Sequence, residues 1–92
     1  MRRLGFVEVV GKNGILVVRP SVNVREDLIG SLVYDSNLRR LGKVVDIIGR
    51  VDDPRLIVKL ESRDLASTIR DYNVYYEPAK RRGARKQGGE TQ

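Results

Sequence analysis

The chain has 92 residues, of which 40% are hydrophobic, and it carries a formal net charge of +6 at pH 7. This length allows one domain with a small core. There is no cysteine and no histidine, which excludes a disulfide framework, a zinc–thiolate centre and the usual catalytic base. The apolar runs are about four or five residues long, far below the roughly 20 of a membrane-spanning helix, so we expect a soluble cytoplasmic protein.

The first half of the domain contains one hairpin pattern and one further apolar run. Residues 6–10 (FVEVV) and 15–19 (ILVVR) are β-rich and flank Gly11-Lys12-Asn13-Gly14. Asn-Gly favours a tight type I′ turn, because both residues tolerate a positive φ, and Pro20 ends the second strand. Residues 28–34 (LIGSLVY) form the next apolar run, which Asp35 closes with turn chemistry.

Two apolar runs in the middle of the chain, residues 44–48 (VVDII) and 56–60 (LIVKL), are joined by residues 49–54. Strict alternation along the first run would place Val44, Asp46 and Ile48 on one face and Val45 and Ile47 on the other. Both faces are then largely apolar. Because only one face of a sheet in a small antiparallel protein normally meets the core, the second face needs cover that another protein could supply.

The last part of the domain holds a break and a final strand. Residues 62–71 interrupt the strand pattern, and Ser62 could begin a short helical turn. Residues 73–77 (NVYYE) are typical of a strand, and Pro78 stops it. The sequence therefore predicts an all-β domain over residues 1–78, a small six-stranded antiparallel β-barrel, since closure removes exposed strand edges.

The charge excess is concentrated after Pro78. Residues 79–92 contain five cations and one glutamate, whereas residues 1–78 contain 13 basic and 11 acidic side chains. With no large apolar side chain, this segment is expected to be a disordered basic tail. Its cations either are simply solvated or contact RNA phosphates without recognising the base sequence. These cations are Lys80, Arg81, Arg82, Arg85 and Lys86.

Three other residue groups have a chemical and a structural interpretation. The carboxylates of Asp46, Asp52 and Asp53 could hold Mg²⁺ or act in acid–base catalysis, but Asp-Asp-Pro is also turn chemistry, and we expect neither an enzyme nor a cofactor. The glycines at strand ends indicate bulges, corners or close backbone approach; they are Gly30, Gly42 and Gly49. Tyrosines on or beside the last strand could stack on RNA bases or pack into the core; they are Tyr72, Tyr75 and Tyr76.

Four segments occur in the order seen in one known family. They are residues 3–5 (RLG), 14–19 (GILVVR), 41–49 (LGKVVDIIG) and 56–59 (LIVK). Over about residues 2–82 the chain resembles the Gar (glycine–arginine-rich) subunit of H/ACA ribonucleoproteins, and its lack of glycine–arginine repeats is similar to the short archaeal members. The resemblance implies a six-stranded β-barrel.

The resemblance also implies a function. Members are non-catalytic subunits that dock on the catalytic domain of the pseudouridine synthase and influence its thumb loop, which assists placement and release of substrate RNA during rRNA pseudouridylation. The family's docking strand usually has the sequence D-V-F-G-P-V, and residues 46–51 here are DIIGRV. Ile48 thus replaces an aromatic residue, and Arg50 replaces a proline. The implied docking residues are Ile47, Ile48, Gly49, Arg50, Val51 and Pro54.

Two alternatives stay open. Residues 28–60 are also similar to the PRC-barrel of ribosome maturation factors, through Leu28-Ile29-Gly30, Asp35 and residues 40–46 (RLGKVVD), although this match leaves the first hairpin unexplained. The other alternative is an autonomous RNA-binding barrel, which would contact RNA through its tail and its tyrosines. Neither interpretation implies a small-molecule ligand or a membrane partner.

Overall fold

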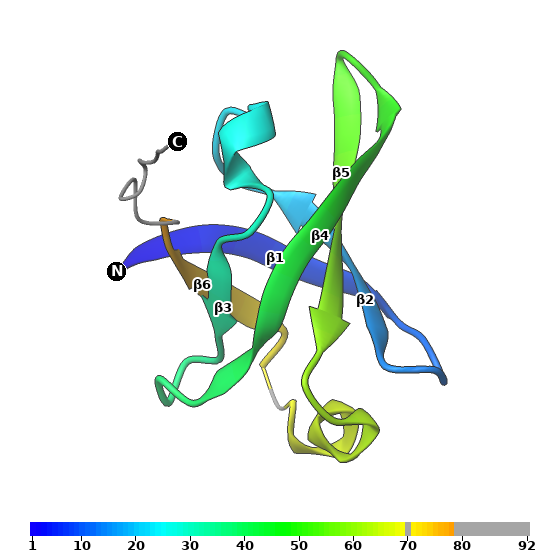
Figure 1. Ribbon diagram of the computed structural model, residues 1–92, viewed down its shortest axis with the longest axis vertical. Coiled ribbons are helices and arrows are strands. Elements are labelled where there is room, and N and C mark those ends of the chain that lie inside the picture. The colour runs from blue at the N-terminus through cyan, green and yellow to red at the C-terminus, as the bar shows by residue number, and fades with distance from the viewer. Residues whose placement is uncertain (70, 79–92) are drawn as a thin grey trace, which may run out of the picture.

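The computed structural model describes residues 1–69 and 71–78, and this part of the chain forms a closed β-barrel (Figure 1). Its strands are β1 (Arg2–Val10), β2 (Ile15–Pro20), β3 (Leu32–Tyr34), β4 (Arg40–Arg50), β5 (Asp53–Leu60) and β6 (Asn73–Glu77). They pair antiparallel in the order β1-β2-β5-β4-β3-β6, and β6 closes the barrel against β1. The predicted six-stranded barrel is confirmed, whereas the predicted tail lies outside the described residues.

The core fills the barrel with aliphatic side chains from every strand. Alternate residues point inward, as in β2, where Leu16 and Val18 are fully buried between half-buried or exposed neighbours. The buried apolar residues are Leu4, Val7, Leu16, Val18, Leu28, Val33, Leu41, Val44, Leu56, Val58, Leu60, Val74 and Tyr76. Since Val, Leu and Tyr suit a pleated, packed surface, the same side chains set the strands and the core.

Two short 3-10 turns lie at opposite ends of the barrel (Figure 1). The turn η1 (Glu26–Leu28) buries Leu28, and η2 (Arg63–Thr68) packs Leu65 against the core. Ser62 caps η2 by accepting a hydrogen bond from the backbone N–H of Asp64 at 3.3 Å, which confirms the helical turn predicted to begin there. No helix in the described ranges is long and apolar enough to cross a membrane.

The first hairpin differs from its prediction in length and turn type. β1 begins at Arg2, because its first residues pair with β6. In the turn Gly14 has a positive φ of 82°, but Asn13 does not, and the N–H of Gly11 donates to the carbonyl of Ile15 at 2.7 Å. The connection is therefore a three-residue loop that ends in a left-handed glycine, and the predicted type I′ turn is wrong.

A β-bulge at Val45 breaks the alternation predicted for residues 44–48. The register runs from Val44↔Val58 directly to Asp46↔Ile57, so Val45 is an extra residue in β4. Val45 and Asp46 are both exposed, and Ile47 then packs against the core while Ile48 points outward. The predicted division of faces is wrong here because one extra residue shifts every later side chain to the opposite face.

Close approach between β4 and β5 requires Gly42. A Cβ at this position would overlap the backbone carbonyl oxygen of Lys59. Gly42 is buried within β4 at the pair Gly42↔Leu60, near the end of the ladder away from the hairpin turn. The predicted interpretation of this glycine as a site of close backbone approach is confirmed.

Candidate protein-docking surface

The β4–β5 hairpin extends beyond the other strands of the barrel (Figure 1). Within the described residues, β2 pairs with β5 only over Leu56–Lys59, and β3 pairs with β4 only over Arg40–Lys43. The ladder between β4 and β5 nevertheless continues through Ile48↔Arg55, Gly49↔Pro54 and Arg50↔Asp53. Residues 48–55, called the hairpin tip below, therefore form a two-stranded ribbon that leaves the barrel.

The backbone of the tip turns through Val51 and Asp52, which connect the two strands. Gly49 has a φ of 92°, a conformation that L side chains rarely adopt, so glycine suits the start of this turn. Pro54 lies inside β5, not in the predicted connection of residues 49–54, which is therefore shorter than expected. Proline is tolerated there because β2 has not yet begun to pair with β5.

The predicted docking residues fall into two groups. Ile48 is 44% exposed and Val51 is 101% exposed, and Gly49 and Arg50 are exposed beside them. Ile47 is half-buried and packs against the core, and Pro54 is also half-buried. The surface available to a partner thus centres on Ile48 and Val51, whereas Ile47 mainly holds the tip on the barrel.

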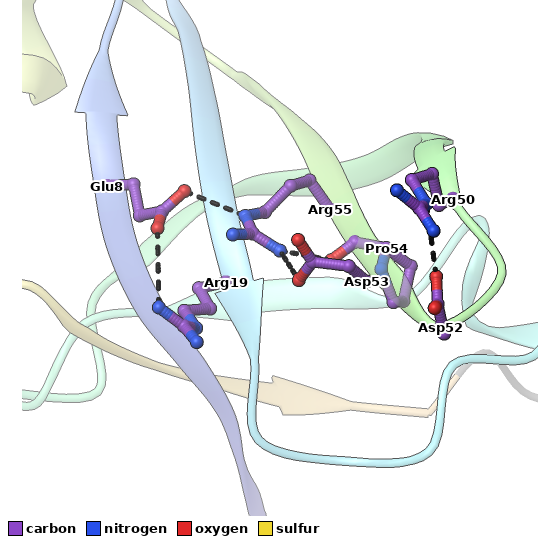
Figure 2. A network of polar contacts seen from close by, with 7 residues as sticks. All are labelled: Glu8, Arg19, Arg50, Asp52, Asp53, Pro54 and Arg55. Atoms are coloured by element: carbon purple, nitrogen blue, oxygen red, sulfur yellow. Dashed lines mark hydrogen bonds and ion pairs between the residues drawn. The ribbon is translucent and has the colours of Figure 1, made fainter.

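A polar network fastens the base of the tip to β1 (Figure 2). Arg55 donates from Nε to Glu8 Oε1 at 2.8 Å and from Nη1 to Asp53 Oδ1 at 2.7 Å and to the carbonyl oxygen of Pro54 at 2.9 Å. Arg19 lies 3.9 Å from the other oxygen of Glu8. Because Arg55 has only 20% of its side chain exposed, these charge-assisted contacts are partly shielded from water.

The same network shifts two pKa values. The hydrogen bond from Arg55, followed by its charge, lowers the pKa of Asp53. Hydrogen bonds to Asp53 and then to Glu8 raise the pKa of Arg55. Glu8 and Arg55 were not singled out from the sequence, and the only signal for Glu8 was a lone acidic residue inside an apolar strand.

The three candidate carboxylates have separate local partners. Asp53 contacts Arg55 at 2.7 Å, Asp52 contacts Arg50 at 3.4 Å, and Asp46 Oδ1 accepts from the backbone N–H of Ile47 at 2.8 Å. The Arg50–Asp52 pair is more than 70% exposed on both sides and contributes little to stability. No cluster of three potential metal ligands occurs among residues 1–69 and 71–78, so the geometry offers these aspartates no common metal site.

An apolar row runs around the outer wall below the tip. The register aligns Val9 of β1 with Val17 of β2, and Val17 with Ile57 of β5. Val9 is 52% exposed, Val17 and Ile57 are half-buried, and the bulged Val45 beside Ile57 is 36% exposed. The sequence predicted a second apolar face that includes both Val45 and Ile47; the outer row contains Val45, whereas Ile47 packs against the core.

A hollow of about 550 Å³ lies between the tip and the segment that follows β2. Arg19 and Arg55 line one part of it, and Val51 and Asp52 line another. Val22 and Val24 contribute apolar atoms from the facing segment. The tip therefore presents a protruding apolar residue and an adjacent recess, a shape that a complementary protein surface could engage.

The predicted tyrosine group is divided by the fold. Tyr76 points into the core and is 5% exposed, Tyr75 is on the outer face, and Tyr72 is 43% exposed with its ring centroid 6.1 Å from that of Phe6. These three rings form no common platform. On β3 the residue opposite Tyr75 is Tyr34, which no sequence pattern singled out. The predicted RNA contacts of Lys80, Arg81, Arg82, Arg85 and Lys86 lie outside the described residues.

Comparison with known proteins adds no family assignment. No protein-family model matches the sequence, and no curated protein matches it significantly.

Proposed function

We propose that this protein is a non-catalytic accessory subunit of an H/ACA guide-RNA complex, which docks through the hairpin tip on the catalytic domain of the pseudouridine synthase. The observation that carries the proposal is the exposed pair Ile48 and Val51 on a ribbon that leaves the barrel. The order of sequence segments shared with the Gar subunit supplies the identity of the partner. Neither observation calls for a cofactor or a small-molecule substrate.

The tip has the physical properties that protein docking needs. Burying one large aliphatic side chain stabilises a complex by roughly 1.5–3 kcal/mol, so Ile48 and Val51 can serve as anchors. The Arg55 contacts to Glu8 and Asp53 hold the ribbon in place before binding. A preordered ribbon loses little conformational entropy on association, which leaves more of the burial energy for affinity.

The proposed role follows from binding to a protein with a mobile loop. A subunit that contacts one conformation of the thumb loop better than another shifts the population toward that conformation. The size of the shift cannot exceed the difference in contact free energy between the two states. In this role the barrel assists placement and release of substrate RNA without supplying any reacting group.

A paired substitution tests the docking surface. Ile48→Asp introduces a charge at the centre of the proposed contact, and Leu38→Asp is the matched control, because Leu38 is 62% exposed in the turn before the opposite end of β4. We expect Ile48→Asp to weaken binding to the purified synthase at least a hundredfold, by several kcal/mol. Leu38→Asp is expected to leave binding unchanged.

Circular dichroism and urea unfolding of both variants complete the test. Because Ile48 is 44% exposed, both variants should fold with the stability of the parent chain to within about 0.5 kcal/mol. Equal binding by the two folded variants would remove the tip from the interface. An unfolded Ile48→Asp variant would show that Ile48 is a core residue, and the site assignment would then be wrong.

A further inference from the structure

A row of four residues crosses the barrel wall opposite the outer apolar row. The register aligns Arg40 of β4 with Tyr34 of β3, Tyr34 with Tyr75 of β6, and Tyr75 with Arg3 of β1. Val33, Val74 and Tyr76 on the same strands are buried, so Tyr34 and Tyr75 lie on the outer face. Both rings are half-buried, and both arginines are exposed. The fold thus places two aromatic side chains between two cations on four successive strands.

Two lysines lie beside this row without an anionic partner. Lys43 of β4 is directly opposite Lys59 of β5, and on its other side Lys43 is opposite Leu32 of β3. Both lysines are exposed, and neither has a carboxylate within 4.0 Å among the described residues. Like charges directly opposite each other destabilise a sheet. An anionic ligand at this place would relieve that repulsion.

The polar contacts of the row fix its side chains but do not neutralise the wall. Tyr34 donates from Oη to Glu77 Oε1 at 3.3 Å, Arg3 donates to the side-chain oxygen of Asn73 at 2.8 Å, and Arg40 contacts Glu61 at 2.8 Å. Burial, followed by the charge of Glu77, raises the pKa of Tyr34, so its hydroxyl stays neutral. Two carboxylates therefore face four cations, which are Arg3, Arg40, Lys43 and Lys59.

We propose that this wall binds single-stranded nucleic acid, with bases against the rings of Tyr34 and Tyr75 and phosphates at Lys43, Lys59 and Arg3. Unpaired bases expose the faces that stack on aromatic side chains, whereas bases within a duplex do not. Lysine binds phosphate as a point charge, and such contacts carry no sequence information. The wall is therefore a low-specificity strand-binding surface. It does not depend on docking of the tip, which lies beyond the other end of β4.

The test uses the full chain and fluorescence anisotropy with labelled 12-nucleotide oligouridine. Replacing Tyr34 or Tyr75 with Leu keeps an apolar side chain on the wall but removes the ring. Each substitution should weaken binding about fivefold to a hundredfold, from the usual contribution of one stacked base. Tyr72→Leu is the matched control, because Tyr72 is an exposed tyrosine outside the row, and it should bind like the parent chain.

A salt titration provides a second measurement that does not alter the rings. Lys43→Gln and Lys59→Gln should each reduce the slope of log affinity against log salt by about 0.7. They should also leave the urea midpoint unchanged or raise it, because the like-charge pair is removed. Oligodeoxyuridine and duplex RNA of the same length serve as comparison ligands. Weaker binding of the duplex is expected, and the ratio for the two single strands shows whether the 2′-hydroxyl contributes.

The outcomes separate this wall from the basic tail and from docking. Every variant keeps the cations of residues 79–92, so these contribute equally to the oligouridine affinity of each. Unchanged oligouridine affinity in both Tyr34→Leu and Tyr75→Leu would therefore overturn the proposal. A duplex bound as tightly as the single strand would overturn it as well. Ile48→Asp should bind oligouridine like the parent chain, so loss of synthase docking and loss of strand binding are independent results.

Discussion

Arg55 and Glu8 lie on strands that are not neighbours, and yet Arg55 Nε donates to Glu8 Oε1 at 2.8 Å across β2. Glu8 reaches this position because a bulge between Val7 and Val9 leaves it as an extra residue in β1. The same guanidinium bonds the carboxylate of Asp53 and the carbonyl of Pro54. One side chain therefore connects the hairpin tip to the far side of β2.

Removing the charge of Glu8 should destabilise the fold by a small, measurable amount. Glu8→Gln keeps the size of the side chain but weakens its bonds to Arg55, and since both side chains are partly exposed we expect a loss of about 1 kcal/mol. Asp27→Asn is the matched control, because Arg25 and Asp27 are over 70% exposed at 3.6 Å. Urea unfolding of the two variants checks the difference, and equal midpoints would contradict a stabilising network.

The pKa of Asp53 predicts the direction of a pH effect. Its pKa is lowered in the folded state by Arg55, so the stabilisation is fully present above the ordinary value of 3.8 and is lost as pH falls through the lower folded pKa. Asp53→Asn should therefore be less stable than the parent chain at pH 6, and the difference should shrink below about pH 4. Urea unfolding across this range measures it. A difference that stays constant down to pH 2 would show that the carboxylate charge is not responsible.

The glycines of β4 should differ in their sensitivity to alanine. Gly42→Ala places a Cβ on the carbonyl of Lys59 and requires the strands to separate, at a cost of about 3 kcal/mol or more. Gly49 has a φ of 92°, and a Cβ added there would lie 3.0 Å from the backbone oxygen of Asp53. Because the ribbon can adjust, we expect Gly49→Ala to lower the free energy of unfolding by about 1–2 kcal/mol. Thermal unfolding ranks the two. The reverse order would mean that β4 and β5 are not in close contact at Gly42.

The bulge at Val45 predicts opposite consequences for two adjacent isoleucines. Ile47 packs against the core and Ile48 is 44% exposed. We expect Ile47→Ala to lower the free energy of unfolding by about 2 kcal/mol and Ile48→Ala by less than about 0.5 kcal/mol. Denaturant unfolding compares them directly. Equal losses would indicate that the register after the bulge is different from Ile47↔Leu56.

Much of the barrel could be predicted because its strands are short and locally specified. The six apolar runs, their turn residues and the Ser62 cap follow from side-chain preferences that act over a few residues. The type I′ turn was wrong because Gly14 alone takes the left-handed conformation, which a three-residue loop permits. The extent of β1 was wrong because its first residues are held by β6, at the other end of the sequence.

The features that matter for binding depend on pairings that sequence alone does not reveal. The bulge at Val45 shifts the register between β4 and β5 by one residue. Glu8 and Arg55 meet only because β2 lies between their strands, and Tyr34 meets Tyr75 only because β6 pairs with β3. Strand order decides the last two of these features, and the local register of β4 against β5 decides the first. Strict alternation placed Ile48 on the face of the buried Val44, so its exposure depends on the bulge.

Calorimetric titration of the parent chain into a purified H/ACA pseudouridine synthase subunit, with no RNA present, tests the docking proposal most directly. We expect saturable one-to-one binding with a negative heat-capacity change, because the exposed side chains of Ile48 and Val51 would become buried. The absence of both heat and a complex by size-exclusion chromatography would contradict docking on the synthase.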